Sequence, residues 1–174
     1  MIQNIVLDLD QTLVSAEAVE DFNINRDMKK AIKFDFQIMP NFYIIFERPY
    51  LQEFLTYIFA NYNVSVWTAA TKDYADFVVK NIIIAGRPER KLDFVFHSDH
   101  CKMSRILRRK LKCLDLLWKR YHLRGYDAKN TVIIDDNSEV FRSQRRNTIR
   151  APPFQFYDKN SEKDKFLIQL MKKL

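Results

Sequence analysis

Four short apolar runs along the chain predict the strands of a buried sheet. They lie at residues 4–9, 64–69, 94–98 and 131–135, and each is rich in β-branched or aromatic residues. Continuous apolarity, in contrast to strict alternation, is typical of strands in a parallel sheet that is covered on both faces. The chain is therefore expected to have a parallel sheet at its core.

Apolar residues recur at helical spacing between and after these runs. The helical segments are residues 48–62, 71–86, 102–122 and 161–174. Pro49 suits a first turn, Thr71 suits an N-cap, and Gly86 suits a position near a helix end. Ser161 and Asp164 form a capping-box pattern at the start of the last segment. Strands that alternate with helices predict a three-layer α/β fold with a Rossmann-like parallel sheet.

One segment, residues 15–47, departs from this alternation. In its second half, apolar and polar side chains alternate on both sides of Pro40–Asn41, which is the pattern of a β-hairpin. We interpret residues 1–174 as a single domain with a small β insertion at about residues 30–47. No segment between the predicted strands is long enough to form a large cap domain.

The chain is basic, with a formal net charge of +7 at pH 7. Residues 102–120 carry eight Lys or Arg against one Asp, and residues 142–150 carry four Arg. Such runs suit either a solvated helix face or the attraction of an anionic partner, such as a phosphorylated peptide or a nucleic acid. Gly86 and Gly125 are the only glycines, which excludes a Walker loop and a dinucleotide-binding fingerprint.

Nothing in the pattern predicts secretion or a membrane span. The first ten residues already contain two carboxylates, and no apolar stretch reaches the ~18 residues that cross a bilayer. We expect an intracellular protein of the nucleus or cytoplasm, without a membrane partner. His97, His100 and Cys101 lack a second ligand pair at zinc-finger spacing, so we interpret them as a strand end and a loop. The oligomeric state is not predicted.

Three of the predicted strands end in polar residues. The first ends at Asp8 and Asp10, the second at Thr68, and the last at Asp135 and Asp136. Ligands of open parallel sheets bind beyond the carboxyl ends of the strands. Buried carboxylates repel one another unless a cation offsets their charge, and oxygen ligands without His or Cys favour Mg²⁺. The alternative is that each acidic pair only caps a turn or a helix.

Motifs along the chain resemble those of a known enzyme superfamily. The segment DLDQTLV at residues 8–14 is similar to the DxDxT signature of haloacid-dehalogenase-type phosphotransferases. Four further motifs resemble those of the FCP/SCP class, which acts on the C-terminal domain (CTD) of RNA polymerase II. These motifs are RPYLQEFL, VSVWTAATKDYAD, LKCLDLLWKRY and VIIDDNSEVF, and with the first they span roughly residues 4–142 in family order.

The resemblance implies a catalytic role for four residues. Asp8 would attack phosphorus as the nucleophile, and Asp10 would act first as general acid and then as general base. Thr68 would donate a hydrogen bond to a phosphoryl oxygen, and Lys112 would neutralise charge on the transferring group. Two other lysines in the same window stay open as alternatives for the last role: Lys102 and Lys110.

The resemblance also implies a metal site and a substrate-binding surface. Mg²⁺ would be held by Asp8, the backbone carbonyl of Asp10, and Asp136, with Asp135 in support. Which of Asp135 and Asp136 touches the ion stays open. The implied substrate-binding residues are Thr12, Arg48, Ala69 and Asn137.

Together, the motifs predict a Mg²⁺-dependent phosphatase that works through an aspartyl-phosphate intermediate. The expected substrate is phosphoserine or phosphothreonine in a protein, for which the CTD of RNA polymerase II is the model that the resemblance implies. Three alternatives stay open: a phosphatase for the 3′ ends of nucleic acids, a small-molecule phosphatase, and a non-catalytic module that binds phosphopeptides.

Overall fold

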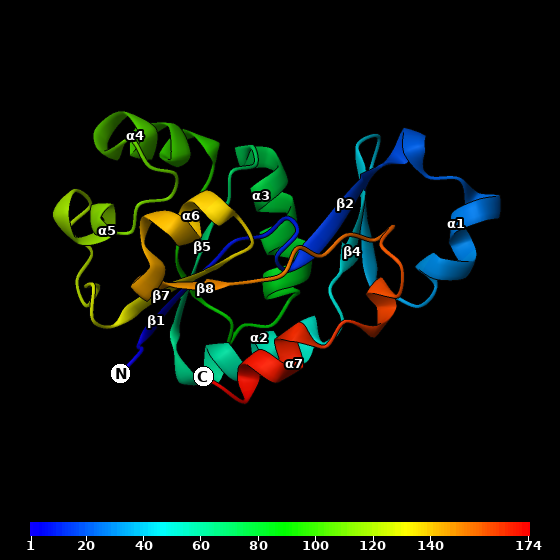
Figure 1. Cartoon of the computed structure of the whole chain (residues 1–174). Helices are drawn as coiled ribbons and strands as arrows, with labels where there is room; N and C mark the ends of the chain where they lie inside the picture. Colours follow the sequence, from blue (N-terminus) through cyan, green and yellow to red (C-terminus); the bar gives the residue numbers. More distant parts are fainter.

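The apolar runs form a five-stranded parallel sheet in the computed structural model, which describes residues 1–174 (Figure 1). In spatial order its strands are β6 (Leu92–Phe96), β5 (Asn63–Trp67), β1 (Asn4–Leu7), β7 (Thr131–Asp135) and β8 (Thr148–Arg150). Adjacent strands are parallel throughout. The predicted α/β fold is confirmed, although the three residues of β8 carry no pattern that predicts a strand.

The central strand β1 sets the position of the functional edge. All of its residues are buried. It pairs with β5 and β7 in matching register, so that Asn4 lies beside both Asn63 and Thr131. Because the three strands start in step, they also end in step, and the residues that follow them meet at one edge of the sheet.

Helices cover both faces of the sheet and complete the three layers (Figure 1). One face carries α2 (Leu51–Asn61), α3 (Lys72–Val78) with its π-helical continuation (Val79–Ile84), and α7 (Phe166–Met171). The other face carries α4 (Ser98–Arg108), α5 (Asp115–Lys119) and α6 (Ser138–Ser143).

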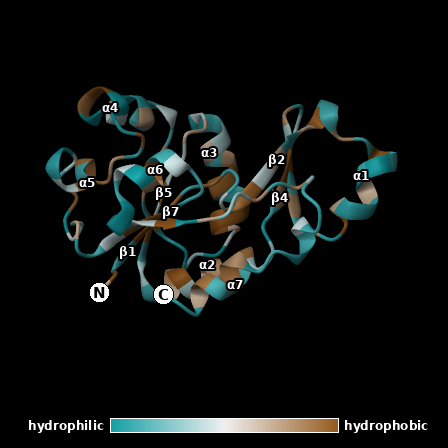
Figure 2. Ribbon diagram, in the orientation of Figure 1, coloured by the Kyte–Doolittle hydropathy of each residue, from teal (hydrophilic) through white to brown (hydrophobic).

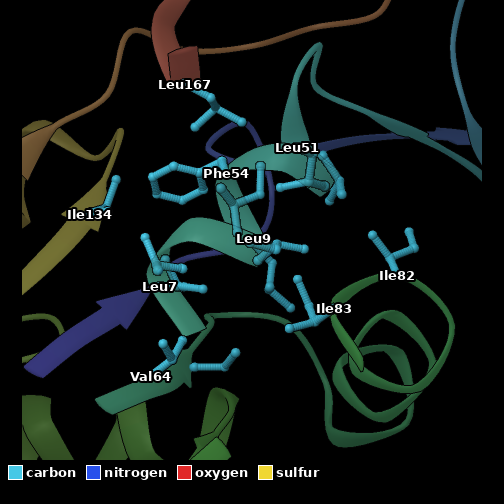
Figure 3. Packing of buried hydrophobic residues seen from close by; sticks show 14 of the residues in the cluster. Leu7, Leu9, Leu51, Phe54, Val64, Ile82, Ile83, Ile134 and Leu167 are labelled. Carbon is cyan, nitrogen blue, oxygen red and sulfur yellow. The ribbon is translucent and has the colours of Figure 1, made fainter. Parts of the chain in front are cut away.

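The larger apolar core lies between the sheet and the first of these helical layers. Figure 3 shows Leu7 and Ile134 of the sheet among Phe54 of α2 and Leu167 of α7. Burial of such surface, at roughly 25 cal/mol per Å², is the main term that stabilises the fold. No helix is both long enough and apolar enough to cross a membrane.

The predicted hairpin is part of a larger insertion between β1 and α2. Its three antiparallel strands, in spatial order, are β2 (Val14–Ala18), β4 (Tyr43–Glu47) and β3 (Phe36–Met39). A 3-10 turn (Val19–Asp21) and α1 (Ile24–Ala31) connect β2 to β3. The hairpin turns at Pro40–Asn41, as predicted. The insertion begins at Val14, however, because β2 also belongs to this sheet.

The chain after β8 returns to the insertion and ties it to the main sheet, as the orange segment in Figure 1 shows. The Phe154 N–H donates to the Gln11 carbonyl at 2.7 Å, and the Phe156 N–H donates to the Ser15 hydroxyl at 2.9 Å. The ring of Phe156 stacks on Phe46 with centroids 3.9 Å apart. Residues 154–156 therefore connect the loop that carries the DxDxT motif to the insertion.

The predicted helix over residues 102–122 is interrupted. The helix α4 ends at Arg108 and α5 begins at Asp115. Between them, Arg109 and Lys112 adopt positive φ angles of 55° and 50°. The prediction that Lys112 lies on a helix is therefore wrong, because tertiary contacts override the helical propensity of this run.

The predicted capping box near the C-terminus is also wrong. Ser161 starts a 3-10 turn, and its hydroxyl donates to the Phe156 carbonyl at 2.8 Å. The helix α7 begins only at Phe166, whose N–H donates to the Asp164 carboxylate at 2.9 Å. Ser161 is used by the preceding loop, so it does not cap a helix.

Arg48 is buried and joins three segments of the chain. Its guanidinium forms a two-pronged ion pair with Asp164, at 2.9 and 2.8 Å. It also donates to the carbonyls of Thr12 at 2.9 Å and Pro152 at 3.0 Å. Because its donors bind groups inside the protein, Arg48 stabilises the loop after β1 through its hydrogen bond to the Thr12 carbonyl.

Replacing Asp164 by Ala is expected to lower the free energy of unfolding by about 3 kcal/mol, because Arg48 then stays buried without its carboxylate. Denaturant unfolding measures the change. Lys72 and Asp76 form an exposed ion pair, so Asp76→Ala is a matched control that should change little. Equal destabilisation by both substitutions would contradict this role of Arg48.

Candidate active site

The predicted chemical residues meet at the carboxyl edge of the main sheet. Asp8 follows β1, and its N–H continues the ladder to a carbonyl of β7 at 3.0 Å. Thr68 follows β5 and bonds in the same way to β6 at 2.9 Å. Asp135 ends β7, and Asp136 comes directly after it. The ends of three neighbouring strands therefore lie side by side at this edge, where the Thr68 hydroxyl accepts the Ala70 N–H at 3.1 Å.

Asp8 is buried, and its two carboxylate oxygens have different partners. Nζ of Lys112 lies 2.5 Å from Oδ1 of Asp8 and 2.8 Å from Oδ2 of Asp135. The hydroxyl of Thr12 lies 2.9 Å from Oδ2 of Asp8. Burial alone would lower the pKa of Lys112, but the charges of Asp8 and Asp135 raise it above its usual value. A cation and a hydroxyl thus hold Asp8 in one orientation.

A tight turn between α4 and α5 brings Lys112 to this site. The Ser104 hydroxyl donates to the Lys110 carbonyl at 2.7 Å, and the Gln144 amide donates to the Lys112 carbonyl at 2.9 Å. Lys102 and Lys110 are exposed. Of the three lysines in this window, Lys112 is the one that contacts the acidic residues.

Three acidic side chains form a candidate metal site. Asp8, Asp135 and Asp136 each offer a carboxylate oxygen, and these oxygens lie within 4.8 Å of one another. Burial, and then the charge of Asp8, raises the pKa of both Asp135 and Asp136. Lys112 supplies one positive charge against the three carboxyl groups. An oxygen set of this kind, without His or Cys, fits a hard divalent cation such as Mg²⁺.

The loop after β1 folds back on itself and links the two acidic strand ends. The Leu9 carbonyl accepts the N–H groups of Thr12, Leu13 and Val14 at 3.2, 2.8 and 3.1 Å. The Thr12 hydroxyl accepts the Asp136 N–H at 3.0 Å and lies 3.3 Å from Oδ1 of Asp136. Thr12 therefore fixes the position of β1 relative to the end of β7.

Asp10 is half-buried, and the hydroxyl of Tyr74 on α3 donates to its Oδ1. Burial raises the pKa of Asp10 to about 6, against the opposing effect of the Tyr74 hydrogen bond. A carboxyl group with a pKa in this range can donate and accept a proton near neutral pH. Sequence reasoning missed Tyr74, although a tyrosine on the first turn of the helix after Thr68 was a usable signal.

The four predicted substrate-binding residues differ in exposure. Thr12 and Arg48 are buried, and their polar groups are bound inside the protein. Ala69 and Asn137 are exposed. The Asn137 side chain caps α6 by accepting the Glu139 N–H at 2.8 Å. Of the four side chains, therefore, those of Ala69 and Asn137 face solvent.

An open depression adjoins Asp10 between the main domain and the insertion. It is lined by Asp10, Ala16, Tyr43, Ala69, Ala70, Thr71 and Tyr74. The rings of Tyr43 and Tyr74 meet edge-on there, with centroids 5.5 Å apart. The depression offers apolar and aromatic surface next to a carboxyl group that can transfer protons.

The chain matches the family model described as NLI interacting factor-like phosphatase over residues 3–174. It is 43% identical over 172 residues to the CTD phosphatase-like protein 355R of Invertebrate iridescent virus 6. That alignment covers 97% of this chain and 94% of the relative. It is 29% identical over 126 residues to the ubiquitin-like domain-containing CTD phosphatase 1 of Danio rerio, covering 71% of this chain and 39% of the relative.

Two solved structures share the fold. A variant of the fission yeast RNA polymerase II CTD phosphatase Fcp1, bound to beryllium fluoride, aligns with a TM-score of 0.61 at 21% identity. That alignment covers 98% of this chain and 51% of the Fcp1 chain. A HAD family enzyme from Bacteroides thetaiotaomicron, in complex with magnesium and inorganic phosphate, aligns with a TM-score of 0.54 at 16% identity over 92% of this chain and 98% of its own.

Proposed function

This chain belongs to the NLI interacting factor-like phosphatase family of the haloacid-dehalogenase superfamily, and from that premise we propose that it hydrolyses phosphoserine or phosphothreonine in a protein substrate. The observation that carries the proposal is the environment of Asp8. Its buried carboxylate directly follows a core strand, contacts Lys112 and Thr12, and belongs to an acidic triad. These are the requirements for a carboxylate that attacks phosphorus.

In the first step, an oxygen of Asp8 attacks phosphorus, and the bond from phosphorus to the seryl or threonyl oxygen breaks. Asp10 gives its proton to the departing oxygen, which leaves as a neutral hydroxyl group. The ammonium of Lys112 and the hydroxyl of Thr68 stabilise the charge on the transferring group. The product of this step is an acyl phosphate on Asp8.

In the second step, water attacks the phosphorus of the acyl phosphate. Asp10, now ionised, takes a proton from the water, and the bond from phosphorus to the Asp8 oxygen breaks. Inorganic phosphate leaves, and both carboxyl groups return to their starting states. The raised pKa of Asp10 suits this alternation between acid and base.

Asp8, Asp136 and the backbone carbonyl of Asp10 would hold Mg²⁺, with Asp135 in support. When bound, the ion offsets the negative charge of the carboxylates and of the incoming phosphate. Asp135 also has a second use, because its carboxylate holds the ammonium of Lys112 at 2.8 Å.

Tyr74→Phe tests whether the Tyr74 hydroxyl positions Asp10. Turnover of a phosphoserine peptide should fall roughly tenfold, the worth of one hydrogen bond to a charged group. An activated aryl phosphate should be affected less, because its leaving group needs little protonation.

Tyr57→Phe is the matched control for this prediction, since it removes a phenol hydroxyl on α2, where Tyr57 packs against Tyr62 outside the depression. It should leave both substrates unaffected. Equal losses on the peptide and on the aryl phosphate would show that Tyr74 does not act through protonation of the leaving group.

A protein substrate is supported by the open surface beside the proposed acid. The depression between Asp10 and Tyr43 is not closed by a cap domain, so a polypeptide can lie across it. The named relatives include CTD phosphatases, which supports a phosphorylated protein and makes the CTD of RNA polymerase II a substrate to test.

A second candidate, a phosphatase for nucleic-acid ends, is favoured by the basic surface. The deciding experiment compares kcat/KM for phosphoserine, phosphothreonine and phosphotyrosine peptides and for 3′-phosphorylated DNA. We expect the first two peptides to be the best substrates. A preference for DNA, with steep salt dependence, would support the second candidate. Binding of these substrates without turnover would contradict both candidates.

A further inference from the structure

A strip of arginines without ionic partners starts at the edge of the active site. It consists of Arg142 on α6, Arg145 and Arg146 in the turn that follows, and Arg150 at the end of β8. All four side chains are exposed. Residues 140–157 contain no Asp or Glu. This arginine strip is therefore a strongly positive surface, and Figure 2 shows both hydrophilic and hydrophobic positions along α6, which carries part of it.

The neighbouring basic helix differs, because its arginines are neutralised within the chain. Arg105 pairs with Glu139 at 2.6 Å, and Arg108 pairs with Asp115 at 2.9 Å. The members of the arginine strip form no ion pair of this kind. Four like charges within nine residues repel one another. An anion that binds there relieves this repulsion and is attracted by all four charges.

Two of the four guanidinium groups lie close to one aromatic ring. The guanidinium carbons of Arg145 and Arg150 each lie 5.7 Å from the centroid of the Phe141 ring. Contacts of a cation with an aromatic face restrict the motion of long side chains. The two groups are therefore partly ordered before any ligand arrives, which lowers the entropy cost of binding.

The sheet register places one end of this strip, Arg150, beside the proposed catalytic residues. Arg150 lies opposite Asp135 on the neighbouring strand, and the Ala151 N–H donates to the Asp135 carbonyl at 3.0 Å. Asp8 lies one strand further on, so two strand spacings, about 10 Å, separate it from Arg150. An extended peptide rises about 3.3 Å per residue and spans this distance in about three residues.

We propose that the arginine strip binds a second phosphate group on the same phosphoprotein, about three to five residues from the phosphoserine or phosphothreonine at Asp8. Guanidinium groups bind phosphate with two parallel hydrogen bonds, which a lysine ammonium cannot do. This inference rests on the proposed protein phosphatase activity and adds a preference for multiply phosphorylated segments. Binding at the strip involves no chemical step.

The test compares two peptides that carry the same phosphoserine. One has neutral flanks, and the other has a non-hydrolysable phosphonate analogue of phosphoserine four residues away. The fourfold variant Arg142→Gln, Arg145→Gln, Arg146→Gln and Arg150→Gln should lose at least tenfold in kcat/KM on the second peptide, through KM. Its turnover of the neutral peptide and of an aryl phosphate should not change.

A variant that removes four charges elsewhere controls for net charge. Lys80, Lys91, Lys172 and Lys173 are exposed and form no ion pair, and their replacement by Gln should leave the difference between the peptides intact. Equal losses in both fourfold variants, or equal losses on both peptides, would overturn the proposal. So would stronger competition by a single-stranded oligonucleotide of the same charge as the second peptide.

A binding measurement separates this inference from the proposed function. Fluorescence anisotropy of the labelled peptides with the Asp8→Asn variant reports affinity without turnover. The peptide with the phosphonate should bind at least tenfold more tightly, and the advantage should vanish when the four arginines are replaced. Loss of activity with this advantage intact would refute the phosphatase reaction alone, whereas equal affinities would refute the arginine strip alone.

Discussion

Replacement of Asp8 by Asn is expected to lower kcat for an aryl phosphate by at least about a thousandfold. An amide oxygen is a far weaker nucleophile than a carboxylate, and no acyl phosphate can form on it. Lys112 keeps its second ion pair, with Asp135 at 2.8 Å, so the variant should fold. Phosphate release and thermal unfolding, measured on the same sample, check the two statements.

Asp35→Asn is a suitable control, because Asp35 is exposed and forms no ion pair. It makes the same chemical change and should leave turnover unaltered. Residual activity above about a tenth in a folded Asp8→Asn protein would exclude Asp8 as the nucleophile.

Chelation of divalent cations by EDTA is expected to reduce turnover by a similar factor, and added Mg²⁺ should restore it. Without a cation, Asp8, Asp135 and Asp136 are balanced only by Lys112, and the anionic substrate must approach an excess of negative charge. Because the site has this excess of negative charge, Mg²⁺ in the absence of substrate should raise the thermal unfolding midpoint of the protein.

Asp136→Asn should remove much of that stabilisation by Mg²⁺, since it deletes one of the three carboxylates without breaking the Lys112 ion pairs. Glu89→Gln removes the same charge at an exposed site and should keep the full response. Two results together would rule out the metal assignment. They are a wild-type unfolding midpoint that does not change when Mg²⁺ is added, and full activity in EDTA.

The sheet and its acidic edge could be predicted because each depends on a short local pattern. The runs that became β1, β5, β6 and β7 are apolar enough to require burial, and polar residues stand directly at their ends. Because β1 and β7 pair in matching register, Asp8 and Asp135 then lie side by side. No contact between distant segments has to be predicted for this. The motif resemblance added the roles of these residues, which geometry alone does not assign.

The features that were missed depend on contacts between distant segments. The turn that carries Lys112 interrupts a run with good helical propensity, because Ser104 and Gln144 bind its backbone. Arg48 was expected to bind substrate, but Asp164, 116 residues away, neutralises it inside the domain. None of these three partners can be identified from spacing or periodicity.

The short strand β8 was missed for a different reason. Its three residues, Thr148–Arg150, include an exposed arginine and only one apolar side chain. An edge strand of this length is stabilised by the neighbouring strand β7 rather than by its own pattern. Without it, sequence reasoning treated the arginines of residues 142–150 as charge alone and could not place them beside the active site.

Trapping the covalent intermediate tests most directly whether Asp8 is the nucleophile. The wild-type enzyme is mixed with a phosphorylated substrate and Mg²⁺, quenched in acid within the first turnovers, digested and analysed by mass spectrometry. We predict that one phosphoryl group is attached to Asp8, and that the label disappears in EDTA and in Asp8→Asn. Turnover at the full rate with no label on Asp8, or with the label on another residue, would contradict the account.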